Sequence, residues 1–83
     1  MDIIAVSRSR DLLSENLRRR RKELGLTQAQ LADAMGCSRV FVTQLERGGR
    51  WPSDETLDSL AHALEMPLAS MFLAAEPVSR QSA

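Results

Sequence analysis

The sequence predicts an all-α domain of five short helices. Two features support this prediction. Apolar residues recur three and four positions apart along most of the chain, which is the spacing that gives a helix one buried face. Glycine, proline and hydroxyl residues separate these segments where helices end and begin. No run of alternating apolar and polar residues is long enough to indicate a strand.

Residues 11–24 are predicted to form the first helix. Leu13, Leu17 and Leu24 fall on one apolar stripe, and Gly25 suits the left-handed conformation that ends a helix. The basic residues before Gly25 lie near the negative end of the helix dipole, where cations are favoured.

Two shorter helices follow, each with its own start signal. Thr27 and Gln30 fit a capping box, and Gly36 ends this second helix after about two turns. Ser38 is a good N-cap for a third helix, which ends at Gly48. The residues expected on the buried faces are Leu31, Ala32, Met35, Val42 and Leu45.

The fourth helix is predicted to begin at Ser53, an N-cap followed by Asp54 and Glu55 at the positive end of the helix dipole. Pro67 ends this helix near Met66 and begins a short fifth helix. The residues expected to face the core are Leu57, Leu60, Ala61 and Leu64 in the fourth helix and Leu68, Met71 and Phe72 in the fifth.

The chain is expected to divide into three parts. Residues 1–10 are predicted to be an N-terminal arm, residues 11–75 the folded domain and residues 76–83 a flexible tail. The first part shows no clear period, and its apolar residues are compatible with a short strand, a packing arm or a fraying end. These residues are Ile3, Ile4 and Val6.

Length and composition exclude several classes of protein. A chain of 83 residues forms one small domain, without room for a large enzyme with a deep substrate pocket. No apolar run approaches the ~20 residues needed to cross a bilayer, so no membrane partner is expected. The start of the chain lacks the cationic region of a secretory signal, and the single Cys37 allows no internal disulfide. A cytoplasmic protein is therefore expected.

The charges cancel over the whole chain but not along it. Residues 1–50 hold ten basic and six acidic residues, an excess of +4, whereas residues 51–83 hold one basic and five acidic residues, an excess of −4. The densest cationic run, Arg18 to Lys22, is typical of a solvated helix face. At about 100° per residue, its side chains cannot all meet one duplex, so nucleic-acid binding requires a second signal.

The second and third helices provide that signal. The small Ala32 allows the third helix to cross close to the second, and Gly36 permits the sharp turn between them. Val42 and Leu45 attach the third helix to the core. This is a helix-turn-helix pattern, in which the second helix of the pair enters a major groove. The side chains left on the other faces are Arg39, Val40, Thr43, Gln44 and Arg47.

A set of spaced positions across four helices forms a larger motif. Its residues are Leu24, Gly25, Leu26, Thr27, Gln28, Leu31, Ala32, Gly36, Val42, Leu45, Glu46, Arg47, Gly48, Pro52, Leu57, Leu60, Ala61, Ala63 and Leu64. With this motif, the segment from about residue 13 to residue 72 resembles the DNA-binding domain of the Cro and phage-repressor family, also called XRE-type. The resemblance implies a compact five-helix lambda-repressor-like domain that binds operator DNA as a homodimer, in a bacterial or phage-encoded protein.

The resemblance also implies which side chains read bases. They are Arg39, Val40, Thr43 and Gln44. Arg39 suits the O6 and N7 acceptors of guanine, and Gln44 suits N6 and N7 of adenine. Val40 suits the thymine methyl group. The alternative for Thr43 and Gln44 is that they are solvated polar residues of the helix surface.

Other positions match contacts to the phosphate backbone. They are Gln28, Ser38, Arg47 and Arg50. The alternative for Arg47 is a favourable interaction with the helix dipole alone. Arg21 and Glu46 match a partly buried ion pair of relatives, which would remove Arg21 from the residues that face DNA.

In relatives the fifth helix forms the dimer contact. The matching residues are Leu68, Met71, Phe72 and Leu73, and the alternative is that they complete the core. Trp51 is expected to pack on the ends of the third and fourth helices, and Cys37 to be a buried or turn thiol. His62 lacks companions at ligand spacing, so no metal or other cofactor is expected.

The predicted function is sequence-specific regulation of transcription, as a repressor bound to double-stranded DNA. One alternative is an antitoxin-type interaction module with a protein partner, and the other is a restriction-modification controller. An enzyme is not expected, because the sequence shows no nucleophile–base pair, metal cluster or phosphate-binding loop.

Overall fold

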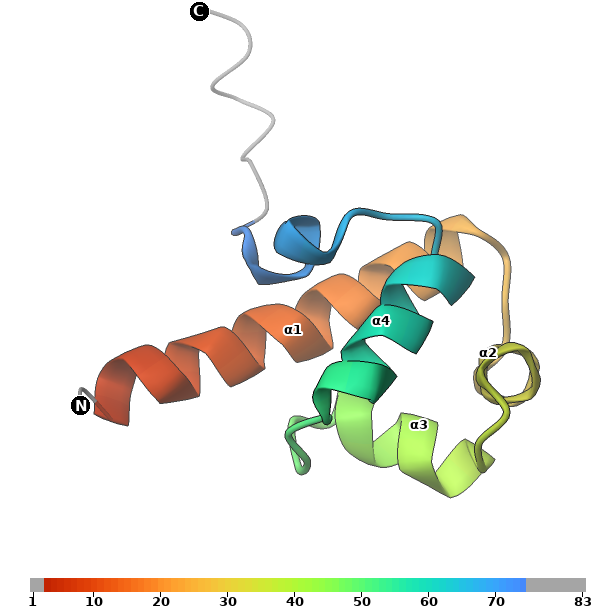
Figure 1. The fold of residues 1–83 in the computed structure, drawn as a ribbon, viewed down its shortest axis with the longest axis horizontal. Helices are drawn as coiled ribbons and strands as arrows, with labels where there is room; N and C mark the ends of the chain where they lie inside the picture. Colours follow the sequence, from red (N-terminus) through yellow and green to blue (C-terminus); the bar gives the residue numbers. More distant parts are fainter. Residues whose placement is uncertain (1–2, 75–83) are drawn as a thin grey trace, which may run out of the picture.

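The computed structural model describes the backbone of residues 3–74 and the side chains of residues 8–74. Over this range it is all-helical, with α1 (Ile3–Glu23), α2 (Gln28–Met35), α3 (Arg39–Glu46), α4 (Asp54–Ala63) and the 3-10 helix η1 (Leu68–Phe72). Figure 1 shows η1 beside α1 and α4 crossing in front of α1 at an angle, with α2 and α3 on the side of the fold away from η1. The predicted all-α class is confirmed. The count of five α-helices is wrong, because the last element is a short 3-10 helix.

The first helix is longer than the sequence pattern predicts. α1 begins at Ile3 rather than near Asp11, so over residues 3–10 the expected arm is part of the helix. The physical reason is that no glycine or proline interrupts this stretch. Once the packed part of a helix has formed, adding residues at its end avoids the cost of a new nucleus. The expected tail, residues 76–83, lies outside the described residues.

The predicted starts of α2, α3 and α4 are confirmed. The Thr27 hydroxyl accepts from the Gln30 backbone N–H, and the Gln30 side chain accepts from the Thr27 backbone N–H. The hydroxyls of Ser38 and Ser53 cap α3 and α4 by accepting from the backbone N–H groups of Phe41 and Thr56. Gly36 ends α2 at φ 72°, a conformation in which a side chain would be strained.

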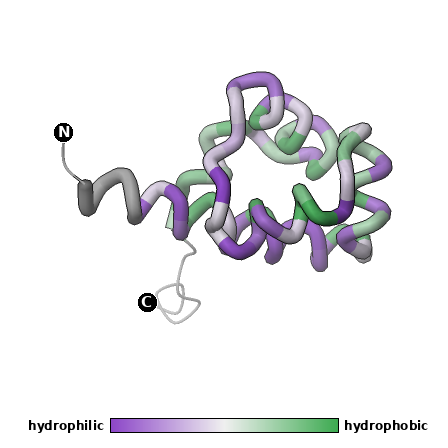
Figure 2. Tube along the Cα trace, turned by 90° about the horizontal axis from the view of Figure 1, so that it is seen from below, coloured by the Kyte–Doolittle hydropathy of each residue, from purple (hydrophilic) through white to green (hydrophobic). Residues whose placement is uncertain are grey.

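One hydrophobic core joins all five elements. Along the helices, hydrophobic and hydrophilic residues alternate in short stretches, as amphipathic helices require (Figure 2). The core consists of Leu13, Leu17, Leu31, Ala32, Val42, Leu45, Leu60, Leu64 and Met71.

Two polar side chains of α1 attach the C-terminal elements, and both were missed from sequence. The buried Asn16 donates from Nδ2 to the carbonyls of Met71 at 2.7 Å and Leu73 at 2.8 Å. Arg20 donates from Nε to the Leu64 carbonyl at 2.9 Å, at the C-terminal end of α4. These bonds satisfy carbonyls that have no partner within their own helix.

None of the helices within residues 3–74 combines the length and apolar character that a membrane crossing requires. The same part of the chain contains no group of three or more His, Cys, Asp or Glu residues arranged to hold a metal ion.

Candidate nucleic-acid interface

Helices α2 and α3 form the predicted helix-turn-helix, and α3 has two distinct faces. Val42 and Leu45 are buried against the core. On the opposite side Arg39 and Arg47 are exposed, and Val40 is 65% exposed. A single exposed valine is ordinary on a protein surface, so this face of α3 is notable only for the combination of Val40 with the two exposed arginines.

An open groove of about 660 Å³ lies between α1 and the helix-turn-helix pair. It brings together all four predicted base-reading residues and two of the four predicted phosphate contacts. The lining residues are Arg18, Arg21, Gln28, Arg39, Val40, Thr43, Gln44, Glu46 and Arg47.

The groove is positively charged. Arg18, Arg39 and Arg47 line it, and its only carboxylate, that of Glu46, is paired with Arg21. Sequence analysis did not assign Arg18 a contact. The signal was present, because Arg18 lies three residues before the inward-facing Arg21 and therefore near the same helix face.

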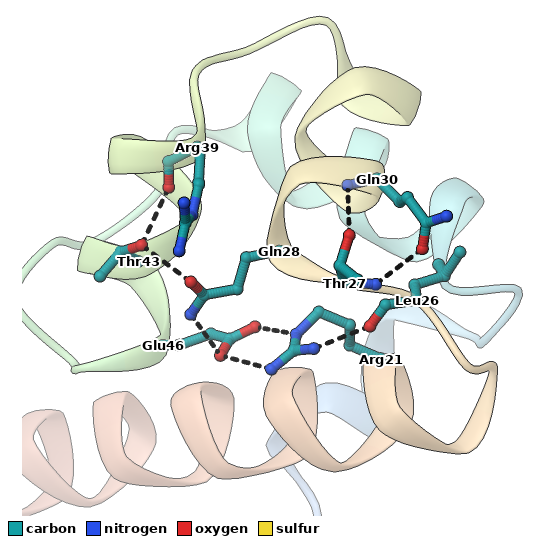
Figure 3. Close-up of polar contacts among 8 residues, drawn as sticks. All are labelled: Arg21, Leu26, Thr27, Gln28, Gln30, Arg39, Thr43 and Glu46. Carbon is teal, nitrogen blue, oxygen red and sulfur yellow. Dashed lines mark hydrogen bonds and ion pairs between the residues drawn. The ribbon is translucent and has the colours of Figure 1, made fainter.

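Arg21 and Glu46, which the resemblance pairs, form a two-pronged ion pair between α1 and α3 (Figure 3). Arg21 Nη2 lies 3.1 Å from Glu46 Oε1, and Nε donates to Oε2. Arg21 also donates from Nη1 to the Leu26 carbonyl at 2.8 Å. Both charged residues are buried, at 9% and 5% exposure, so this geometry ties α1 to α3.

Two further groove residues extend this polar cluster. Gln28 donates from Nε2 to Glu46 Oε1 at 3.1 Å. Thr43 Oγ1 lies 3.2 Å from Gln28 Oε1 and 3.0 Å from the Arg39 carbonyl (Figure 3). The Thr43 hydroxyl is therefore engaged within the protein, although sequence analysis assigned it to a base.

Ser38 and Arg50 lie outside the lining of the groove. Ser38 is at the start of α3, where its hydroxyl accepts from the Phe41 backbone N–H. Arg50 follows α3, and its guanidinium carbon lies 5.1 Å from the centre of the Phe41 ring. Arg50 Nη1 also donates to Gln44 Oε1 at 3.3 Å.

The residues predicted to form a dimer contact have different environments. Met71 is fully buried in the core, so its assignment to an interface is wrong: a side chain without accessible surface cannot touch a partner. Leu68 and Leu73 are 40% and 61% exposed. Phe72 is half-buried and lies 6.0 Å from the ring of Trp51. The exposed Trp51 thus packs against η1, a contact that the sequence analysis did not predict.

Cys37 lies in the turn between α2 and α3 and is half-buried. Burial raises the pKa of its thiol above the ordinary value, because the thiolate would lose hydration. The turn therefore holds a thiol with reduced reactivity.

Comparison with known proteins agrees with this geometry. Residues 17–70 match a helix-turn-helix family model, HTH_3, and the chain belongs to this family. These are XRE-type DNA-binding regulators of transcription, with repressors among them, and the resemblance seen in the sequence is confirmed.

The relatives include regulators from bacteria and phages. Transcriptional regulator ClgR of Mycobacterium tuberculosis is 32% identical over 73 residues, which cover 87% of this chain and 65% of that protein. Repressor protein C2 of Salmonella phage P22 is 41% identical over 54 residues, 65% of this chain and 25% of that protein. This chain therefore spans less than two thirds of the length of either relative.

Solved structures share the fold. The restriction-modification controller protein C.AhdI of Aeromonas hydrophila has a TM-score of 0.72 and 33% identity to this chain. The match covers 76% of this chain and 96% of that one.

Proposed function

We propose that this protein is a sequence-specific repressor of transcription that binds a two-fold-symmetric operator as a homodimer, with α3 in the major groove. The observation that supports the proposal is the free face of α3 beside a groove lined by Arg18, Arg39 and Arg47. This arrangement offers side chains that can reach base edges next to cations that can contact phosphates. A cytoplasmic location fits this function.

The side chains of α3 suggest the mode of reading. Arg39 can donate two hydrogen bonds to guanine O6 and N7, and Gln44 can pair with adenine N6 and N7. Val40 can contact a thymine methyl group. All three line the groove.

Backbone contacts would surround this reading face. Arg47 and Gln28 line the groove, and Arg18 joins them from α1. Ser38 and Arg50 would contact phosphates at the two ends of α3. Phosphate contacts fix the register of a reading helix on the duplex.

Dimerisation would use the exposed apolar residues near the C-terminal end of the described chain. Leu68 and Leu73 are exposed, and Phe72 is accessible in part. Two reading helices in a dimer would meet half-sites about one turn apart, ~34 Å.

The proposal is tested by selecting an operator from genomic fragments and measuring footprints and affinity. We expect the Arg39→Ala, Gln44→Ala double variant to lose about 1–3 kcal/mol for each base contact removed. Arg19→Ala is the control, because Arg19 lies outside the groove and within 3.8 Å of Glu23. An unchanged footprint and affinity for the double variant would show that α3 does not read the operator.

A restriction-modification controller is a second candidate, because this chain covers 96% of the controller C.AhdI. It is a narrower form of the same function. Restriction and methyltransferase genes beside the gene of this protein would support it, and a neighbourhood without them would count against it.

A further inference from the structure

The hydroxyl of Thr43 faces two acceptors and no donor. Its oxygen lies 3.0 Å from the Arg39 carbonyl and 3.2 Å from Gln28 Oε1. A threonine hydroxyl has one hydrogen, so it donates inward to one of these oxygens. The group therefore has no hydrogen left for a base, although it lines the groove.

The amide of Gln28 is held in one orientation. The Glu46 carboxylate only accepts hydrogen bonds, so the Gln28 nitrogen faces it at 3.1 Å. The Gln28 oxygen then faces the Thr43 hydroxyl, which supplies the matching donor. The reversed amide would place two acceptors, Gln28 Oε1 and Glu46 Oε1, against each other.

This orientation leaves one N–H of Gln28 unused by the bonds described. Phosphate oxygens only accept hydrogen bonds, so this N–H is the part of the amide that can bind a DNA backbone. Glu46 is itself fixed by the buried Arg21, which anchors the amide to α1 (Figure 3).

We propose that Thr43 is a positioning residue that acts through Gln28, and not a base-reading residue. With Glu46, it holds the Gln28 amide so that its free N–H meets a backbone phosphate. Hydrogen bonds of Gln28 to two fixed partners reduce the rotamer freedom that DNA binding would otherwise remove. This inference rests on the proposed DNA-binding function.

A double-mutant cycle on the full chain and its selected operator tests the proposal. Thr43→Val and Thr43→Ala remove the hydroxyl, Thr43→Ser keeps it, and Gln28→Met removes the amide while keeping chain length. Each variant is titrated against the operator and against operators with single base-pair changes. Circular dichroism melting checks that each variant is folded at the assay temperature.

We expect Thr43→Val and Thr43→Ala to weaken binding by about 2- to 12-fold, and by the same factor on every operator variant. Thr43→Ser should bind like the parent protein. The double variant Thr43→Val, Gln28→Met should bind no more weakly than Gln28→Met alone, because both changes remove the same phosphate contact.

Three results would overturn the proposal. They are a loss of discrimination at one base pair in Thr43→Val, additive losses in the double variant, and parent-like affinity of both hydroxyl-free variants. If the parent protein binds its operator specifically in the same titrations, any of these results contradicts only the role of Thr43. If the parent protein binds no operator specifically, both the role of Thr43 and the proposed DNA-binding function are wrong.

Discussion

Glu46 shows how one residue supports both the fold and the candidate interface. Its carboxylate is 5% exposed and accepts bonds from Arg21 on α1 and from Gln28 on α2. It therefore links three helices at one point. A buried charge that loses its partner remains costly to bury, so the pair is sensitive to removal of either member.

We predict that Glu46→Ala costs about 3–5 kcal/mol of unfolding free energy, because it leaves the Arg21 guanidinium buried without its partner. A domain of this size has only about 3–9 kcal/mol in total. Thermal melting by circular dichroism should show a large fall in Tm. Glu15→Ala, which removes an exposed glutamate of α1, is the control. Equal melting of the two variants would contradict a stabilising role for the ion pair.

Cys37 gives the domain a predicted sensitivity to alkaline pH. Burial raises the pKa of its thiol in the folded state, so the unfolded chain ionises first as the pH rises. This contribution to stability is complete below the unfolded pKa, about 8.5, and is lost as the pH approaches the folded pKa. Between about pH 7 and pH 10, urea unfolding should show a larger fall in unfolding free energy for the parent protein than for Cys37→Ala. Identical losses would show that this thiol does not titrate differently on folding.

At the scale of the element, the end of α4 contains a strained residue. Glu65 has φ 53°, and the bonds from Glu65 N to the His62 carbonyl and from Met66 N to the Ala61 carbonyl form a Schellman ending. Glycine is usual at this left-handed position, because a Cβ there costs about 1–2 kcal/mol.

We predict that Glu65→Gly raises the unfolding free energy by up to about 1 kcal/mol. The strain energy that it relieves exceeds the entropic cost of ordering a glycine, which is more flexible in the unfolded chain. Glu65→Ala is the matched control, because it removes the same carboxylate and keeps the Cβ. Chemical denaturation of the two variants gives the comparison. A glycine variant no more stable than the alanine variant would show that this backbone is not strained.

The starts of α2, α3 and α4 could be predicted from sequence, whereas the start of α1 could not. The caps at Thr27, Ser38 and Ser53 depend on bonds within three residues, so local chemistry specifies them. The extension of α1 to Ile3 has no such marker. The assignment of Met71 failed because spacing places an apolar residue on a helix face but does not say whether the chain itself covers that face.

Across the whole molecule, the arginine run divides among different tasks. Arg18 lines the groove, Arg19 lies near Glu23, Arg20 binds the end of α4 and Arg21 pairs with Glu46. Two members of the four thus line the groove, and Glu46 offsets the charge of one of them, Arg21. The total charge of a segment therefore overstates the charge available to a duplex.

We predict that Arg18→Ala makes the slope of log K against log salt concentration about 2 less negative for a dimer, since each lost phosphate contact removes about 0.9 from this slope. Arg19→Ala changes the net charge equally and should leave the slope unchanged. Dissociation constants measured over a series of salt concentrations give both slopes. Equal flattening by the two variants would show that Arg18 acts only through net charge.

The sequence alone determined the helical class, the helix-turn-helix and most helix boundaries, because periodicity and capping are local properties of the chain. Its spaced motif also indicated the family, by resemblance. Its zero net charge hides excesses of +4 and −4 in the two parts of the chain. Only the tertiary structure decided which arginine faces the groove, that Met71 is core and that Thr43 bonds to Gln28. These outcomes depend on how α1, α2 and α3 approach one another, and contacts between distant segments are set by packing of the whole core.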